Sequence, residues 1–136
     1  MSELGAACGP VCGAVLFVAL AGGRLPSTRP RAGPRVLTIR WVWLGTLASI
    51  EELVWRGLVL TGLALALGTA VALVLSSLGF AAWHAPELGR SCAVHVLTGL
   101  GFGGALLVGG LGAAVAAHAT YNILVDWAVQ AERARS

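Results

Sequence analysis

The sequence predicts an all-α fold, a polytopic transmembrane helical bundle of about five spans. Two observations support this prediction. The chain of 136 residues is 57% hydrophobic and only 11% charged, whereas about 25% of the residues of a soluble domain are charged. Polar and glycine-rich breaks also divide the chain into apolar runs of about 20 residues, the length of a membrane-crossing helix. All nine basic residues are arginines, and apart from Arg56 they collect at the ends of these runs, so nucleic acid is not expected as a partner.

Residues 1–22 are predicted to form an N-terminal transmembrane helix. The run is rich in Gly and Ala, and Gly9-Pro10 can kink it or delay its start. A cleaved signal peptide has basic residues before its apolar core, whereas the charged residue that precedes this run is the acidic Glu3, so we expect the span to be retained. Residues 23–40 contain arginines and prolines at a density that excludes a helix interior, which predicts a basic cytoplasmic loop.

Residues 41–130 form the predicted core. Within this core the sequence predicts weak helix breaks at Thr61-Gly62 and Gly68-Thr69, a helix end at Pro86 and a tight turn at Gly109-Gly110. The resulting spans are 41–60, 63 or 67 to 83, 91–108 and 111–129, with a short loop at 87–90. Glycines crowd the last two spans, where they allow helices to approach closely. Residues 131–136 are predicted to be a polar tail.

The arginines predict the orientation of the bundle, because cytoplasmic loops are enriched in basic residues. With the Arg24–Arg40 loop in the cytoplasm, a five-span topology returns Arg90, Arg133 and Arg135 to the same side. The C-terminus is then cytoplasmic, and the N-terminus lies outside. We therefore expect a multi-pass integral membrane protein with the lipid bilayer as a partner.

Glu51, Glu52 and Arg56 lie inside the apolar run that begins at Trp41. A charge at membrane depth costs roughly 2.5–3.5 kcal/mol on insertion scales, so these three side chains need partners. Glu52 and Arg56 are four residues apart and share a helix face, which predicts an intrahelical ion pair. Glu51 points about 100° away from Glu52 and is expected to meet a different neighbour.

Further polar residues are predicted at the same depth. His84 ends the third span, four residues after Phe80, and His118 and Asn122 share a face of the fifth span. A carboxylate and an imidazole that face each other can bind and deprotonate a water, which fits Glu51 and His84. His118 and Asn122 can offer N–H donors at one point, as an oxyanion hole does. These are the parts for hydrolysing an acyl or peptide bond, and no Ser or Cys lies in a comparable constellation.

The motifs Glu51-Glu52-x-x-x-Arg56, Phe80-x-x-x-His84 and His118-x-x-x-Asn122 follow in this order on successive predicted helices. Together they resemble the three motifs of the CAAX protease and bacteriocin-processing (CPBP, or Abi) family of intramembrane endopeptidases, which includes the type II CAAX prenyl proteases. The resemblance covers about residues 41–130 and implies glutamate-dependent hydrolysis of a membrane-associated peptide or protein. The implied catalytic residues are Glu51, His84, His118 and Asn122. The implied supporting residues are Glu52, Arg56 and Phe80.

Alternatives stay open at this stage. Two histidines and a glutamate also form a zinc-type ligand set, and some members of the family are described as metalloproteases; we favour a metal-free site without a cofactor. The same constellation suits a non-catalytic membrane interaction or immunity protein, or a proton or ion pathway, because buried Glu and His residues also serve as relays. Outside the motifs, His95 is interpreted as a packing or interface residue and Asp126 as a solvated end-cap.

Overall fold

The computed structural model describes residues 3–20 and 32–133, and every regular element within them is helical. No β-strand occurs among these residues, which confirms the all-α prediction. Residues 21–31, which include the first half of the predicted basic loop, lie outside the described part, as do residues 134–136 of the predicted tail.

A long helical rod carries the first half of the core. α2 (Pro34–Glu52) continues through a π-helical segment, η1 (Leu53–Leu60), into α3 (Thr61–Leu67). The predicted break at Thr61-Gly62 is therefore wrong. The rod ends at Gly68, where φ is +81°; glycine adopts this conformation without the steric penalty of a side chain.

The second half of the core contains α4 (Thr69–Leu88), a short 3-10 segment, η2 (Gly89–Ala93), and α5 (Val94–Arg133). α5 has non-helical backbone angles at Gly110, where φ is +76°. This break divides α5 into two halves and confirms the turn predicted at Gly109-Gly110.

The helices around two prolines have other boundaries than the sequence predicted. Pro34 begins α2, where a helix needs no backbone N–H, so residues 34–40 are helical and not part of a loop. Pro86 lies within the last turn of α4, and the helix continues to Leu88. The loop predicted at 87–90 is consequently replaced by the end of α4 and by η2.

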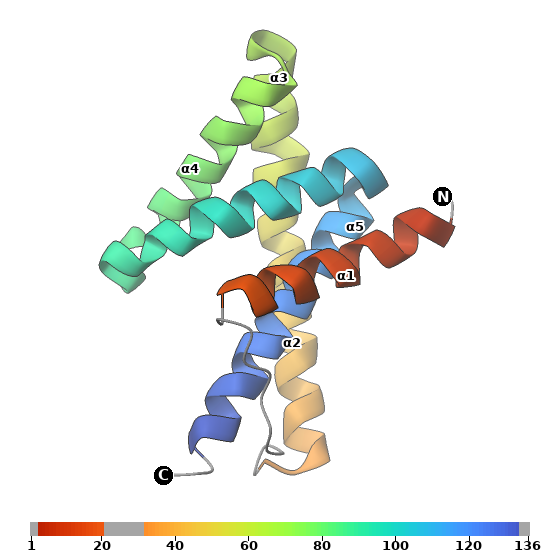
Figure 1. Cartoon of the computed structure of the whole chain (residues 1–136), viewed down its shortest axis with the longest axis vertical. Helices are drawn as coiled ribbons and strands as arrows, with labels where there is room; N and C mark the ends of the chain where they lie inside the picture. Colours follow the sequence, from red (N-terminus) through yellow and green to blue (C-terminus); the bar gives the residue numbers. More distant parts are fainter. Residues whose placement is uncertain (1–2, 21–31, 134–136) are drawn as a thin grey trace.

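α5 is the element around which the other helices are arranged (Figure 1). Its halves before and after Gly110 run in different directions. α4 packs on the first half and α2 on the second, while α1 (Glu3–Leu20) crosses α5 near the break. The two polar segments that the sequence singled out, in α2 and in the second half of α5, thereby become neighbours.

Glycines bring the helices close together. At Gly9 and Gly13 of α1, an added Cβ would collide with the backbone carbonyl oxygens of Ala113 and Ala117 in α5. Gly99 of α5 lies similarly close to the backbone of α4. Gly99 of the predicted fourth span therefore serves the close packing expected there, and Gly9 and Gly13 of α1 do the same.

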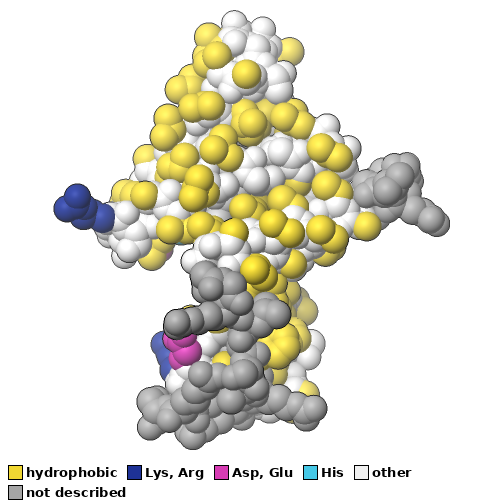
Figure 2. All heavy atoms as spheres, in the orientation of Figure 1, with side chains coloured by type: hydrophobic (Ala, Val, Ile, Leu, Met, Phe, Trp, Pro, Cys, Tyr) yellow, Lys and Arg dark blue, Asp and Glu magenta, His cyan; other side chains and the backbone are white. Residues whose placement is uncertain are grey.

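Many large apolar side chains face outward, and several charged or polar ones are buried. Figure 2 shows hydrophobic side chains over much of the visible face, with charged side chains at its edges. Leu65, Val108 and Trp83 are among the most exposed large apolar residues. Glu52 and Arg56, in contrast, are 0% and 1% exposed. An exterior of this kind suits contact with lipid, since soluble monomers rarely expose large contiguous apolar patches.

By length and composition, one stretch of the described chain, Thr69–Arg133, is able to cross a membrane. Ala7–Leu20 within α1 is a shorter apolar helix. The number of spans and the sides on which the termini lie stay predictions.

Replacing Gly13 by alanine tests the contact between α1 and α5. The added methyl group meets the Ala117 carbonyl, so we expect a loss of about 1–3 kcal/mol of unfolding free energy, the usual penalty for overpacking. Gly104→Ala is the matched control, because nothing lies within 4 Å of a Cβ at that position. Thermal unfolding in detergent micelles compares the two variants; equal melting temperatures would contradict the close approach of the helices.

Candidate active site

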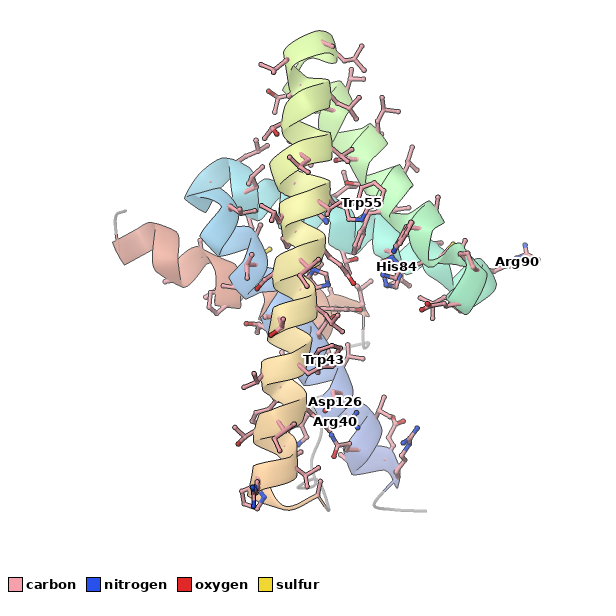
Figure 3. All side chains as sticks on the ribbon, turned by 180° about the vertical axis from the view of Figure 1, so that it is seen from behind. Arg40, Trp43, Trp55, His84, Arg90 and Asp126 are labelled. Atoms are coloured by element: carbon pink, nitrogen blue, oxygen red, sulfur yellow. The ribbon has the colours of Figure 1, made fainter. Side chains whose placement is uncertain are left out.

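The candidate site lies where α2 passes into η1. Glu51 and Glu52 are the last residues of α2, and Arg56 lies in the π-helical segment that follows. π-helical turns occur frequently at functional sites. In Figure 3, His84 of α4 lies close to Trp55 of η1, between the rod and α4. The site is thus enclosed by α2 with η1, by α4 and by α5.

Glu52 is the centre of a buried group of charges. Its Oε1 lies 3.0 Å from Nη1 of Arg56, which confirms the predicted intrahelical ion pair. The same oxygen lies 2.8 Å from Nδ1 of His118. Nη1 makes no hydrogen bond to a described residue, so its contact with Glu52 is electrostatic, whereas Nη2 donates to the Gly99 carbonyl over 3.1 Å.

Glu51 faces a different set of atoms, as the helical geometry predicts. Its Oε2 lies 3.6 Å from Nε2 of His118 and 4.0 Å from Nε2 of His84. The imidazole of His118 therefore lies between the two adjacent glutamates, with one ring nitrogen toward each. The Glu51 side chain is 30% exposed and that of Glu52 is 0% exposed, so Glu51 is the carboxylate that an incoming molecule reaches.

The backbone defines the protonation of the His84 ring. Nδ1 of His84 lies 2.9 Å from the carbonyl oxygen of Phe80, one turn earlier in α4. A carbonyl oxygen only accepts hydrogen bonds, so Nδ1 carries the proton in this contact. In the neutral ring Nε2 then holds a lone pair, directed to the side where Glu51 lies.

The Phe80 ring is surrounded by the cationic and imidazole side chains of the site. The guanidinium carbon of Arg56 lies 4.6 Å from the ring centroid, a cation–π contact. The centroids of His84, His95 and His118 lie 4.7, 5.7 and 5.8 Å away. Phe80 thus packs against the other motif residues, in keeping with its expected supporting position.

Sequence reasoning missed two rings that belong to this cluster. Phe102 of α5 stacks on His118 with centroids 4.5 Å apart and an interplanar angle of 17°. His95 stacks on His84 at 4.4 Å and 20°. Both contacts join residues on different helices or on different halves of α5, so no spacing within one helix could indicate them.

Asn122 is the one predicted catalytic residue that makes neither a hydrogen bond nor an ion pair with another residue of the site. It forms no hydrogen bond with any described residue. It does lie midway between His118 and Asp126, one helical turn from each, and both of these residues contact α2. Asn122 is therefore on the face of α5 that is turned toward α2, next to the cluster.

Asp126 is not the solvated end-cap that the sequence predicted. Its side chain is 9% exposed and pairs with Arg40 near the start of α2, as Figure 3 also shows. Gln130 donates a hydrogen bond to the same carboxylate over 2.6 Å. The close passage of α2 beside α5 covers a residue that the end of a free helix would expose.

Within the described residues, no three His, Cys, Asp or Glu side chains are arranged to hold a metal ion. The zinc-type ligand set that the sequence allowed is therefore not assembled in this geometry. The chemistry available to the site consists of two carboxylates, a guanidinium, three imidazoles and a carboxamide.

Comparison with known proteins identifies one family. The model of the family described as "Type II CAAX prenyl endopeptidase Rce1-like" matches residues 34–124. This segment runs from the start of α2 to just beyond Asn122 and contains every residue predicted to form or support the site. No curated protein and no solved structure gives a significant match to the chain.

Removing Arg56 tests the buried charges. Arg56→Met leaves Glu52 buried without its cation, which we expect to cost about 3–5 kcal/mol of unfolding free energy. Arg90→Met is the matched control: it removes an exposed arginine of η2, and surface substitutions of this kind change the unfolding free energy by only about 0.5 kcal/mol or less. Chemical denaturation in micelles measures both losses. Similar losses would contradict the central position of the Glu52–Arg56 pair.

Proposed function

This chain belongs to the Rce1-like family of type II CAAX prenyl endopeptidases, and on that premise we propose that it hydrolyses a peptide bond with a water activated by Glu51 and His84. The family is one of membrane-integral proteases, so the reaction would take place on a membrane-associated peptide or protein. The roles of the individual side chains in this reaction are inferred from their contacts in the site and are part of the proposal.

The facing pair of Glu51 and His84 is the observation that carries the proposal. Oε2 of Glu51 and the Nε2 lone pair of neutral His84 are both hydrogen-bond acceptors, 4.0 Å apart. Two acceptors do not bond to each other, but a water between them can donate one O–H to each at ordinary hydrogen-bond lengths. A water held in this way presents its oxygen lone pairs to a third group, the carbonyl carbon of a substrate.

The proposed reaction proceeds in two steps. In the first, the water oxygen adds to the carbonyl carbon of the peptide bond while Glu51 takes one proton from the water, and the carbonyl oxygen becomes an oxyanion. In the second, the C–N bond breaks and the proton passes from Glu51 to the leaving amine. Glu51 returns to its carboxylate form, and no side chain becomes covalently attached to the substrate.

His118 and Asn122 would stabilise the oxyanion. Glu52 accepts a hydrogen bond from Nδ1 of His118, so Nε2 donates only when the ring carries two protons. Buried beside two carboxylates and one guanidinium, a protonated His118 makes the formal charges of the group sum to zero. Asn122, one turn further along the same face, would add its amide N–H as a second donor.

The membrane arrangement is part of the same proposal. We infer a bundle of about five spans with the N-terminus outside and the C-terminus on the cytoplasmic side. The apolar exterior and the buried charges support a site below the membrane surface. Partial exposure of Glu51 gives a substrate access to this site while Glu52 stays covered.

Replacing Glu51 by glutamine tests the proposed base. Glutamine keeps the size of the side chain but cannot take a proton, so we expect kcat to fall by about 10²- to 10⁴-fold. The assay follows a quenched-fluorescence peptide that ends in a farnesylated CAAX sequence, and its unprenylated counterpart, in detergent micelles. Glu87→Gln, an exposed glutamate at the end of α4, is the matched control and should cleave like the wild type.

Either of two other results would contradict the proposal and favour a different function. Cleavage at the wild-type rate by both Glu51→Gln and His84→Ala would remove these residues from the reaction and leave a non-catalytic membrane protein. Proton flux through liposomes containing the wild type, without cleavage of either peptide, would favour a proton pathway. Elemental analysis of the purified protein establishes whether a metal ion accompanies it.

Replacing Asn122 by alanine separates its expected contribution to catalysis from stability. The side chain makes no hydrogen bond to a described residue, so the melting temperature should change little. Loss of one oxyanion donor should lower kcat by about 10²- to 10³-fold. A variant that melts early and keeps its kcat would show that Asn122 supports the fold and not the reaction.

A further inference from the structure

We propose that His95 is a positioning residue for His84, holding its imidazole in the plane that directs Nε2 toward Glu51. The inference rests on the proposed function, because it gives a purpose to the orientation of His84. His95 belongs to none of the three sequence motifs. All three histidines of the chain nevertheless meet around the Phe80 ring.

The hydrogen bond of His84 does not fix its ring by itself. The bond joins Nδ1 to the Phe80 carbonyl within the same helix and fixes one ring atom. The ring can still rock about that atom, and Nε2 is the part that moves most. Such a rotation of the ring would change the 4.0 Å distance between Nε2 of His84 and Oε2 of Glu51. A water between these two atoms would then no longer be at hydrogen-bond distance from both.

Two rings restrict this motion. The Phe80 ring meets His84 edge-on, at 4.7 Å and 66°. The His95 ring lies nearly parallel to that of His84, at 4.4 Å and 20°. A parallel ring at this distance covers one face of the imidazole, so the plane of His84 cannot tilt toward it without a steric clash.

His95 is itself firmly placed. It is the second residue of α5, directly after η2. Its carbonyl accepts a 3.4 Å hydrogen bond from the hydroxyl of the buried Thr98. Its ring also meets Phe80, at 5.7 Å and 49°. The support for His84 therefore comes from a second helix, α5, and not only from α4.

His95 acts through the face of its ring. Its Nδ1 is buried and makes no hydrogen bond to any described residue. The contacts that it does make, with His84 and Phe80, are ring contacts. A phenyl group at this position would cover the same face of His84, whereas a methyl group would not.

Kinetics of two variants test this inference with the farnesylated CAAX peptide described above. His95→Ala removes the stacked ring, and we expect kcat to fall by about tenfold to 100-fold with KM unchanged. His95→Phe restores a flat ring and should return kcat to within about threefold of the wild type, at an equal or higher melting temperature, because it removes an unpaired buried nitrogen. Val96→Ala, which truncates the half-buried neighbour, is the matched control and should keep the wild-type kcat.

A spectroscopic measurement needs no substrate and so tests the positioning even if the proposed function fails. In ¹⁵N-histidine-labelled protein at alkaline pH, long-range ¹H–¹⁵N spectra resolve the two ring nitrogens of His84. Motion of the ring about the hydrogen-bonded Nδ1 broadens the Nε2 and ring C–H signals, so we expect narrow signals in the wild type and in His95→Phe and broadened signals in His95→Ala. Equally narrow signals in all three proteins would overturn the inference, as would a wild-type kcat in His95→Ala or an equal loss in His95→Phe.

Discussion

The buried carboxylate of Glu52 is the interaction on which the rest of the structure depends. Its Oε1 contacts Arg56 and His118, and Arg56 donates to the carbonyl of Gly99. Gly99 precedes the break in α5 at Gly110, and His118 follows it, so one pair of side chains on the rod holds both halves of α5. Separating these helices would leave the Glu52–Arg56 pair intact on the rod but would remove its hydrogen bonds to His118 and to the Gly99 carbonyl. Each hydrogen bond to a charged group contributes about 1.5–3 kcal/mol. Close packing at the glycines reinforces an arrangement that the charges already require.

The two adjacent glutamates have different surroundings because they leave the helix in different directions. Glu52 is enclosed and its partners are fixed, whereas Glu51 is partly exposed and lies at 3.6 and 4.0 Å from two imidazoles, too far for a direct hydrogen bond. Glu52 therefore has short contacts to its neighbours, whereas the carboxylate of Glu51 stays accessible. His118, which touches both, links the two parts.

The sequence predicted those features that depend on spacing within one helix. Glu52 and Arg56, four residues apart, form the expected pair, and the turn at Gly110 occurs where two glycines adjoin. The π-helical segment was not predicted, since no spacing of residues in Leu53–Leu60 distinguishes a π-helix from an α-helix. Stacking of Phe102 on His118 was also missed, because it depends on the fold of α5 at its break. Asp126 was misjudged for a similar reason: its burial is produced by α2, far away in the sequence.

The length of the rod has a consequence for the membrane around it. From Pro34 to Leu67 the continuous helix is about 50 Å long, whereas the hydrocarbon core of a bilayer is about 30 Å thick. In the proposed membrane arrangement, this excess length would be met by tilting the rod, by letting its ends protrude or by deforming the lipid. Because Glu51 lies at the middle of the rod, it would lie deepest when both ends protrude equally and nearer a membrane surface when one end takes up the excess. Lipid composition would thereby influence the depth of the candidate site.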